Sequence, residues 1–152
     1  RQIMETTHPS RAGRDDFARF GGTMSGNPVG AAASLASLDI LAGPGVYERL
    51  YATTERLRAA LRSLADERGV PVQVLGAGPV FQLLFTDRPV PDYPAFLAAD
   101  RVKSRQFGLE CIRRGVTTTP GEKFYVSLAH SDEDIDETIA IFSAAFDAVL
   151  AS

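Results

Sequence analysis

The chain has 152 residues, of which 45% are hydrophobic and 23% charged, and its formal net charge is −3. These values are typical of a globular domain with a sizeable core. The weakly acidic balance argues against a nucleic-acid or anionic-membrane partner, because both require a basic face. No apolar run approaches the roughly 18 residues that span a bilayer, and no secretory signal begins the chain. We therefore expect a soluble, cytoplasmic protein in which the lone Cys111 is a small core residue.

The first third of the chain is predicted to contain a polar loop, a glycine-rich turn and one helix. Residues 6–20 form the loop. The turn, Gly21 to Pro28, crowds three glycines, two hydroxyl groups and an amide into eight residues. Its donors and the nearby helix dipole suit an anion, although a turn that merely joins two elements is the alternative. Helix 29–41 is rich in small residues, so we expect it to be buried, and residues 42–45 end it.

The middle of the chain reads as a long helix, a hairpin and a second helix. Residues 46–68 are amphipathic, with one apolar stripe formed by leucines at positions 50, 57, 61 and 64. Two apolar strands, 70–75 and 80–85, flank a Gly/Pro turn, which is the pattern of an antiparallel hairpin. A further helix is predicted over residues 93–114.

The last third is predicted to contain two short strands and a final helix. Residues 115–120 read as a strand that runs into a turn, and residues 124–128 read as another strand. Helix 131–150 has a clear start signal, because Ser131 is a good N-cap and Asp134 occupies the capping-box position. The predicted fold class is α+β: long helices followed by a small, mainly antiparallel sheet covered by helices on one side.

Two sequence blocks resemble a known family. GGTMSGNPVGAAASLASLDIL, residues 21–41, resembles the segment that follows the active-site lysine in class III, fold-type I pyridoxal-phosphate enzymes. VSLAHSDEDIDETI, residues 126–139, resembles the C-terminal signature of the same family. The match looks most like glutamate-1-semialdehyde 2,1-aminomutases and their aminotransferase relatives. It implies that residues 1–43 end the cofactor-binding large domain, with the phosphate-contact turn and an interface helix, and that residues 44–152 form the C-terminal small α+β domain.

The resemblance also implies that this chain is the C-terminal portion of a longer enzyme. Its first residue is not methionine, and the opening RQIME is similar to a stretch in the middle of the family's polypeptide. Lys103 and Lys123 are the only lysines, and neither follows a strand in the family's pattern. The Schiff-base lysine is therefore expected upstream. We assign no catalytic residue to this chain and expect it to be inactive alone.

The predicted cofactor contact is Gly22 and Thr23. The resemblance implies that this pair binds the phosphate of pyridoxal 5'-phosphate in the neighbouring subunit of a homodimer. Backbone N–H and hydroxyl donors form strong charge-assisted bonds to phosphate, and glycine allows close approach. Ser25 and Asn27 are expected to shape the turn and cap the following helix. The other expected ligand is a small amino or keto acid substrate, with no nucleic acid and no membrane.

The predicted substrate-gate residue is Glu122. It falls where aminomutases carry a glutamate near the substrate entrance, but the loop is shorter here, and a solvated pair with Lys123 is the alternative. The acidic run 132–137 is interpreted as charge at a helix N-terminus, and no metal site is expected. His130 is interpreted as a hydrogen-bonding structural residue.

The sequence thus predicts a pyridoxal-phosphate-dependent aminotransferase or aminomutase, which transfers amino groups between amino acid and keto or aldehyde substrates. One alternative is an ω- or β-amino-acid transaminase of the same class, which the altered loop at residues 121–123 favours. The other is a stand-alone dimerisation or regulatory domain without catalysis.

Overall fold

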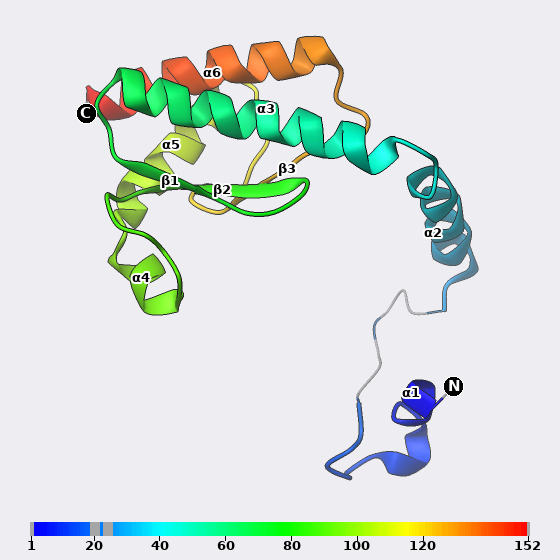
Figure 1. Ribbon diagram of the computed structural model, residues 1–152. Coiled ribbons are helices and arrows are strands. Elements are labelled where there is room, and N and C mark those ends of the chain that lie inside the picture. The colour runs from blue at the N-terminus through cyan, green and yellow to red at the C-terminus, as the bar shows by residue number, and fades with distance from the viewer. Residues whose placement is uncertain (1, 19–21, 23–25, 152) are drawn as a thin grey trace. The chain divides into compact units, whose positions relative to one another are not determined.

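The computed structural model describes residues 2–18, 22 and 26–151. It divides into two compact units, Arg1–Gly43 and Pro44–Ser152 (Figure 1). In the described part of the chain, no single helix is long and apolar enough to cross a bilayer.

The described residues of the first unit form two helices and one short 3₁₀ turn. Helix α1 spans Gln2–Glu5, the 3₁₀ turn η1 spans Pro9–Arg11, and helix α2 spans Pro28–Leu41. The predicted loop therefore contains one helical turn. Its acidic residue Asp16 is ion-paired with Arg11 and, at 3.1 Å, with Arg14.

Helix α2 begins at Pro28, one residue before the predicted start, because Asn27 caps it. The Asn27 side-chain oxygen accepts hydrogen bonds from the amides of Val29 at 2.9 Å and Gly30 at 3.1 Å. The expectation that this helix is buried is wrong for the single chain, since none of its residues is buried. Leu35 and Leu38 are 63% and 60% exposed. The helix is apolar around its circumference, and nothing in the described part of this chain covers it.

The second unit confirms the α+β fold class. Its helices are α3 (Val46–Glu67), α4 (Tyr93–Ala98), α5 (Arg101–Arg113) and α6 (Asp132–Leu150). Its strands are β1 (Val72–Leu75), β2 (Val80–Phe85) and β3 (Lys123–Tyr125). They form an antiparallel sheet in the order β1-β2-β3, so the predicted hairpin is confirmed.

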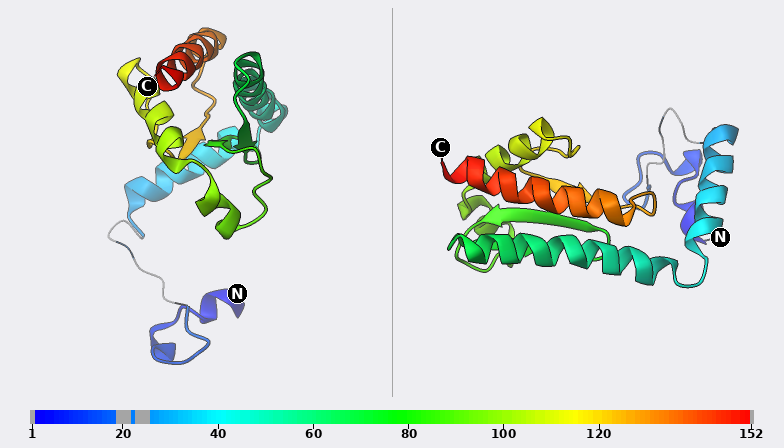
Figure 2. Two further views of the ribbon diagram at one scale, coloured as in Figure 1. Left: turned by 90° about the vertical axis from the view of Figure 1, so that its left-hand side faces the viewer. Right: turned by 90° about the horizontal axis from the view of Figure 1, so that it is seen from above.

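Helices α3, α5 and α6 cover one face of this sheet. Figure 2 shows α3 and α6 side by side over the strands when the molecule is seen from above. The core between helices and sheet contains a cluster of phenylalanines among aliphatic residues. Phe107 and Phe146 have ring centroids 4.8 Å apart, and Phe81 stacks on Phe124 at 5.1 Å. Cys111 belongs to this core with 0% exposure, as predicted.

The opposite face of the sheet is less covered. Because side chains alternate along a strand, Phe81, Leu83 and Phe85 enter the core, while Gln82 and Leu84 point to the other face. Helix α4 lies on that side of the sheet (Figure 1), and Leu84 is fully buried.

Three predicted elements differ from the structure. The predicted helix 93–114 is interrupted between α4 and α5, because the Asp100 amide donates to the Phe85 carbonyl at 2.9 Å. The Asp100 side chain then caps α5 by accepting from the Lys103 amide at 2.8 Å. The predicted strand 115–120 is wrong: these residues pair with no strand in the described part of the chain, and Gly115 has a φ of 107°. The strand expected over 124–128 is β3, which ends at Tyr125.

Candidate cofactor and substrate site

The glycine-rich turn is described at Gly22 and from Gly26 onward. Gly22 is exposed, and Thr23 lies outside the described residues, as does Ser25. The first amides of α2 are already occupied, because Asn27 accepts from both Val29 and Gly30. These two amides are therefore not free to bind a phosphate, whereas Gly22 is exposed. The helix dipole still favours an anion there.

The predicted gate residue lies in a tight turn of residues 119–122. The Glu122 amide donates to the Thr119 carbonyl at 2.9 Å. Pro120 occupies the second position and Gly121, with a φ of 79°, the third, which is the pattern of a type II turn. This backbone geometry explains the Pro-Gly pair.

The side chain of Glu122 is exposed and has no hydrogen bond or ion pair within the described part of the chain. The alternative of a Glu122–Lys123 pair has no support from the structure, because no such contact lies within ion-pair distance. Lys123 instead begins strand β3 opposite Gln82. The turn thus presents a carboxylate that no described basic residue neutralises.

Neither lysine is placed for covalent catalysis within this chain. Lys103 lies in the first turn of α5 with its Nζ 5.9 Å from the Phe85 ring centroid, and Lys123 is exposed on a strand. No described residue forms a nucleophile-and-base pair with either lysine.

His130 has a structural role, as predicted. Its Nδ1 accepts a hydrogen bond from the Ser127 amide at 3.0 Å, which closes the segment between β3 and α6. Next to it, Ser131 and Asp134 form a capping box. The hydrogen bond from the Ser131 amide, followed by that from its hydroxyl, lowers the pKa of Asp134. The hydrogen-bonding groups of these three residues are therefore used to form the segment before α6 and its N-terminal cap. Among the described residues, no group of three or more His, Cys, Asp or Glu side chains is placed to hold a metal ion.

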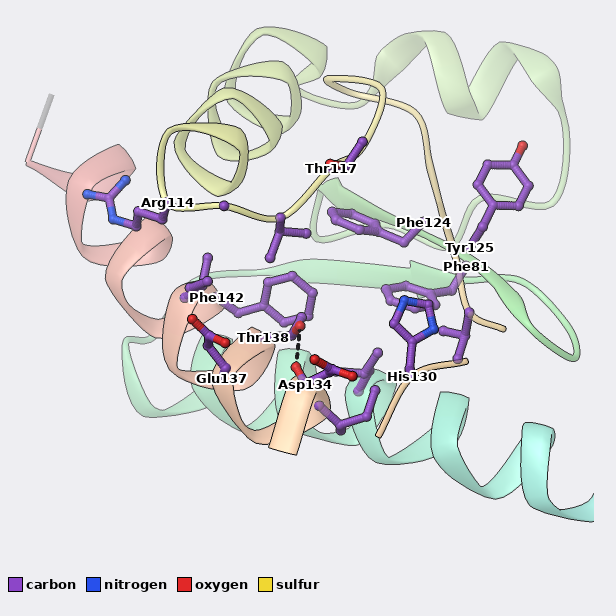
Figure 3. Close-up of a pocket in the computed structure, with 16 residues that line it drawn as sticks. Phe81, Arg114, Thr117, Phe124, Tyr125, His130, Asp134, Glu137, Thr138 and Phe142 are labelled. Carbon is purple, nitrogen blue, oxygen red and sulfur yellow. Dashed lines mark hydrogen bonds between the residues drawn. The ribbon is translucent and has the colours of Figure 1, made fainter. Parts of the chain in front are cut away.

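A cavity of about 360 Å³ lies between the segment after α5, strand β3 and the first half of α6 (Figure 3). Phe81, Phe124 and Phe142 form its floor, while Arg114 and Glu137 lie at one end of its rim. Sequence reasoning missed this cavity because its floor comes from three elements that are distant in the chain. None of the predicted site residues lines it. Arg114 is paired with Glu110, and the cavity combines its aromatic floor with polar side chains of α6, among them Glu137 and Thr138.

Comparisons with known proteins agree with this fold. The chain matches the family model Aminotransferase class-III over residues 1–146. It is 40% identical over 127 residues to the glutamate-1-semialdehyde 2,1-aminomutase of Desulfosudis oleivorans, covering 82% of this chain and 30% of that protein.

Two solved structures are similar over nearly the whole chain. A β-phenylalanine aminotransferase from Variovorax paradoxus has a TM-score of 0.77 at 25% identity, covering 99% of this chain and 34% of that one. An omega-transaminase from Sphaerobacter thermophilus has a TM-score of 0.75 at 26% identity, covering 97% and 33%.

The chain belongs to the class III aminotransferases, a family of pyridoxal-phosphate enzymes. It spans about a third of the length of the relatives it matches, with 30% of the aminomutase and 33% of the omega-transaminase.

Proposed function

We propose that this chain is part of a pyridoxal-phosphate-dependent aminotransferase or aminomutase that moves amino groups between amino acid and keto or aldehyde substrates. The observation that carries the proposal is the 40% identity over 127 residues to a glutamate-1-semialdehyde 2,1-aminomutase. When bound, the cofactor supplies the electron sink for chemistry at the substrate's α-carbon. The residues of this chain bind the cofactor phosphate and the substrate and orient them around that carbon. The protein acts in the cytoplasm.

In this proposal, residues 1–43 end the cofactor-binding large domain, and residues 44–152 form the small domain. The division of the structure between Gly43 and Pro44 supports this assignment. Gly22 and Thr23 hold the cofactor phosphate with backbone and hydroxyl donors, and Glu122 lies at the substrate entrance. The carboxylate of Glu122 is exposed and has no partner among the described residues, which supports a role in binding.

The active unit in this proposal is a homodimer in which Gly22 and Thr23 serve the partner's site. Helix α2 supports it, because Leu35 and Leu38 are exposed in the single chain and a helix that is apolar all round is normally buried. The occupant of that surface is then a second copy of the protein.

The function is tested by assaying the intact protein, supplied with pyridoxal phosphate, against a panel of amino donors and keto acceptors and against glutamate-1-semialdehyde. Conversion of the semialdehyde without a second substrate identifies an aminomutase. Transfer only between separate donor and acceptor identifies a transaminase. If no substrate is converted and no visible cofactor absorption appears, the enzyme proposal is wrong, and a dimerisation or regulatory domain remains.

A second candidate is an ω- or β-amino-acid transaminase of the same class. It is favoured by the similarity in structure to the β-phenylalanine aminotransferase and the omega-transaminase, whose TM-scores are 0.77 and 0.75. The same substrate panel separates the two candidates, because only this one predicts a preference for donors with a distal amino group.

The phosphate contact can be tested at Thr23. Thr23→Ala removes one hydroxyl donor, so retention of pyridoxal phosphate by the intact protein should weaken by about 1–2 kcal/mol, the scale of a charge-assisted hydrogen bond. Equilibrium dialysis measures this loss, and Thr23→Ser, which keeps the hydroxyl, serves as the control. Unchanged retention in Thr23→Ala would remove this residue from the site.

A further inference from the structure

The turn that carries Glu122 is in direct backbone contact with helix α5. A Cβ atom built on Gly108 would lie 2.8 Å from the Cα of Pro120 and 3.1 Å from the amide nitrogen of Gly121. Real Cβ atoms do not approach backbone so closely. Glycine at position 108 therefore allows the turn to rest on the helix, and this contact fixes one side of it.

Gln82 holds the turn from the sheet. Its side chain lies on the face of β2 that points away from the aromatic core. The Nε2 group donates to the Gly121 carbonyl at 2.9 Å in a partly buried position. Because Gln82 is paired across the sheet with Lys123, this bond ties the strand to the turn just before β3 begins. No other side chain donates to a carbonyl of residues 119–122 in the described part of the chain.

The backbone around Glu122 is thus fixed from a helix and from a strand, while its carboxylate is exposed and bonds to no residue that the structure describes. A binding group is effective when the residues behind it hold it in one position. We propose that Gln82 is a positioning residue that fixes Glu122 for binding the amino group of the substrate. This inference rests on the proposed function, in which Glu122 lies at the substrate entrance.

The physical consequence concerns binding more than chemistry. Without the Gln82 bond, the turn samples other positions. The apparent affinity for the substrate then falls in proportion to the fraction of molecules whose turn is in the binding-competent position. The attraction between the carboxylate and the ammonium group of the substrate weakens as the distance between them grows. Once the substrate is bound, the reacting atoms are unchanged. Loss of the bond should therefore raise KM for the amino substrate and leave kcat unaltered.

The kinetic test uses the intact holoenzyme and four variants: Gln82→Met, Glu122→Gln, the double variant, and Gln73→Met as a control. Gln82→Met keeps the length of the side chain but removes the donor. Gln73 lies on the same face of the sheet in β1, is also half-buried, and makes no side-chain hydrogen bond to the turn. Gln82→Met should raise KM about fivefold, the ratio that one net hydrogen bond is worth, with kcat unchanged. Gln73→Met should leave both constants at the wild-type values.

The double variant decides whether Gln82 acts through Glu122. If it does, Gln82→Met adds nothing to KM in the Glu122→Gln background, because there is no carboxylate left to position. An equal rise of KM in both backgrounds would overturn the inference, as would an unchanged KM in Gln82→Met. If Gln82→Met is unstable, Gly108→Ala displaces the same turn from the helix side and should give the same pattern.

Hydrogen exchange separates this inference from the proposed function. The Glu122 amide is bonded within the turn, so its exchange should become at least about fivefold faster in Gln82→Met and stay unchanged in Gln73→Met. Unchanged exchange in Gln82→Met overturns the positioning role whatever the activity. Faster exchange together with a KM that is unchanged in Glu122→Gln supports the role of Gln82 in fixing the turn. The same result overturns the gate role of Glu122.

Discussion

At the scale of single residues, Arg68 joins the end of α3 to α6 with its whole guanidinium group. Its Nε lies 2.7 Å from the Asp147 carboxylate, and one Nη donates to the Ser143 hydroxyl at 2.8 Å. The other Nη donates to the Leu64 carbonyl at 3.0 Å, near the end of α3. The side chain is 18% exposed, so these bonds are better shielded from solvent than those of an ordinary surface ion pair.

Replacing Arg68 by methionine should lower the free energy of unfolding by about 1–2 kcal/mol, because bonds to a charged donor are lost while the apolar stem remains. Denaturant unfolding measures the change. Arg88→Met is the control, since Arg88 is 84% exposed and should change stability by less than about 0.5 kcal/mol. Equal losses in the two variants would contradict the assigned role.

The Arg68 contact also predicts a pH dependence. The hydrogen bond from Arg68 lowers the pKa of Asp147. A lowered carboxyl pKa contributes stability above the ordinary value, and this contribution is lost as pH falls through the lowered pKa. The stability difference between wild type and Arg68→Met should therefore shrink in acid.

Cys111 predicts a pH dependence at the alkaline end. Burial raises the pKa of its thiol from 9.0 to about 12. Since the folded chain holds the proton more tightly than the unfolded chain, stability is intact below pH 9 and falls between pH 9 and 12, by up to about 1.4 kcal/mol per pH unit. Comparing the pH slopes of wild type and Cys111→Ala isolates this effect, because the two proteins differ only at this thiol. Parallel slopes would contradict it.

At the scale of elements, the clearest local determinant is the start of α6. The Ser131 hydroxyl accepts from the Asp134 amide at 3.1 Å, and the Asp134 carboxylate accepts from the Ser131 amide at 2.7 Å. This helix then contributes Ile135, Phe142 and Phe146 to the core. The cap therefore sets the register in which three core side chains meet the sheet and α5.

Ser131→Ala should lower the free energy of unfolding by about 1 kcal/mol, the usual value of an N-cap side chain. Ser131→Asp should restore most of the loss, because aspartate caps as well as serine. Ser63→Ala on the exposed face of α3 is the control for loss of a hydroxyl. A loss that Ser131→Asp does not restore would argue against capping as its cause.

At the scale of the whole molecule, the main feature is the apolar surface of α2. Leu35 and Leu38 are 63% and 60% exposed, and Ile40 is 62% exposed. A helix that is apolar all round is stable in water only when other protein covers it. In the proposed homodimer, the second subunit supplies part of that cover.

Leu38→Lys should therefore weaken self-association of the intact protein by at least about tenfold, because it places a charge in an apolar interface. Sedimentation velocity over a range of concentrations measures the shift. Val102→Lys is the matched control: Val102 is 70% exposed on α5 and should leave association unchanged. A protein that is monomeric before substitution would contradict the homodimer.

The sequence by itself determined the family, the order of most elements, and the caps at Asn27 and Ser131, because a cap depends on residues within four positions of each other. The tertiary structure decided the break at Asp100, the absence of a strand over 115–120, and the hold of Gln82 on the turn of Glu122. Those features depend on partners far apart in the chain: Gln82 and Gly121 are separated by 39 positions. Local propensity carries no information about such partners, because only packing brings them within bonding distance.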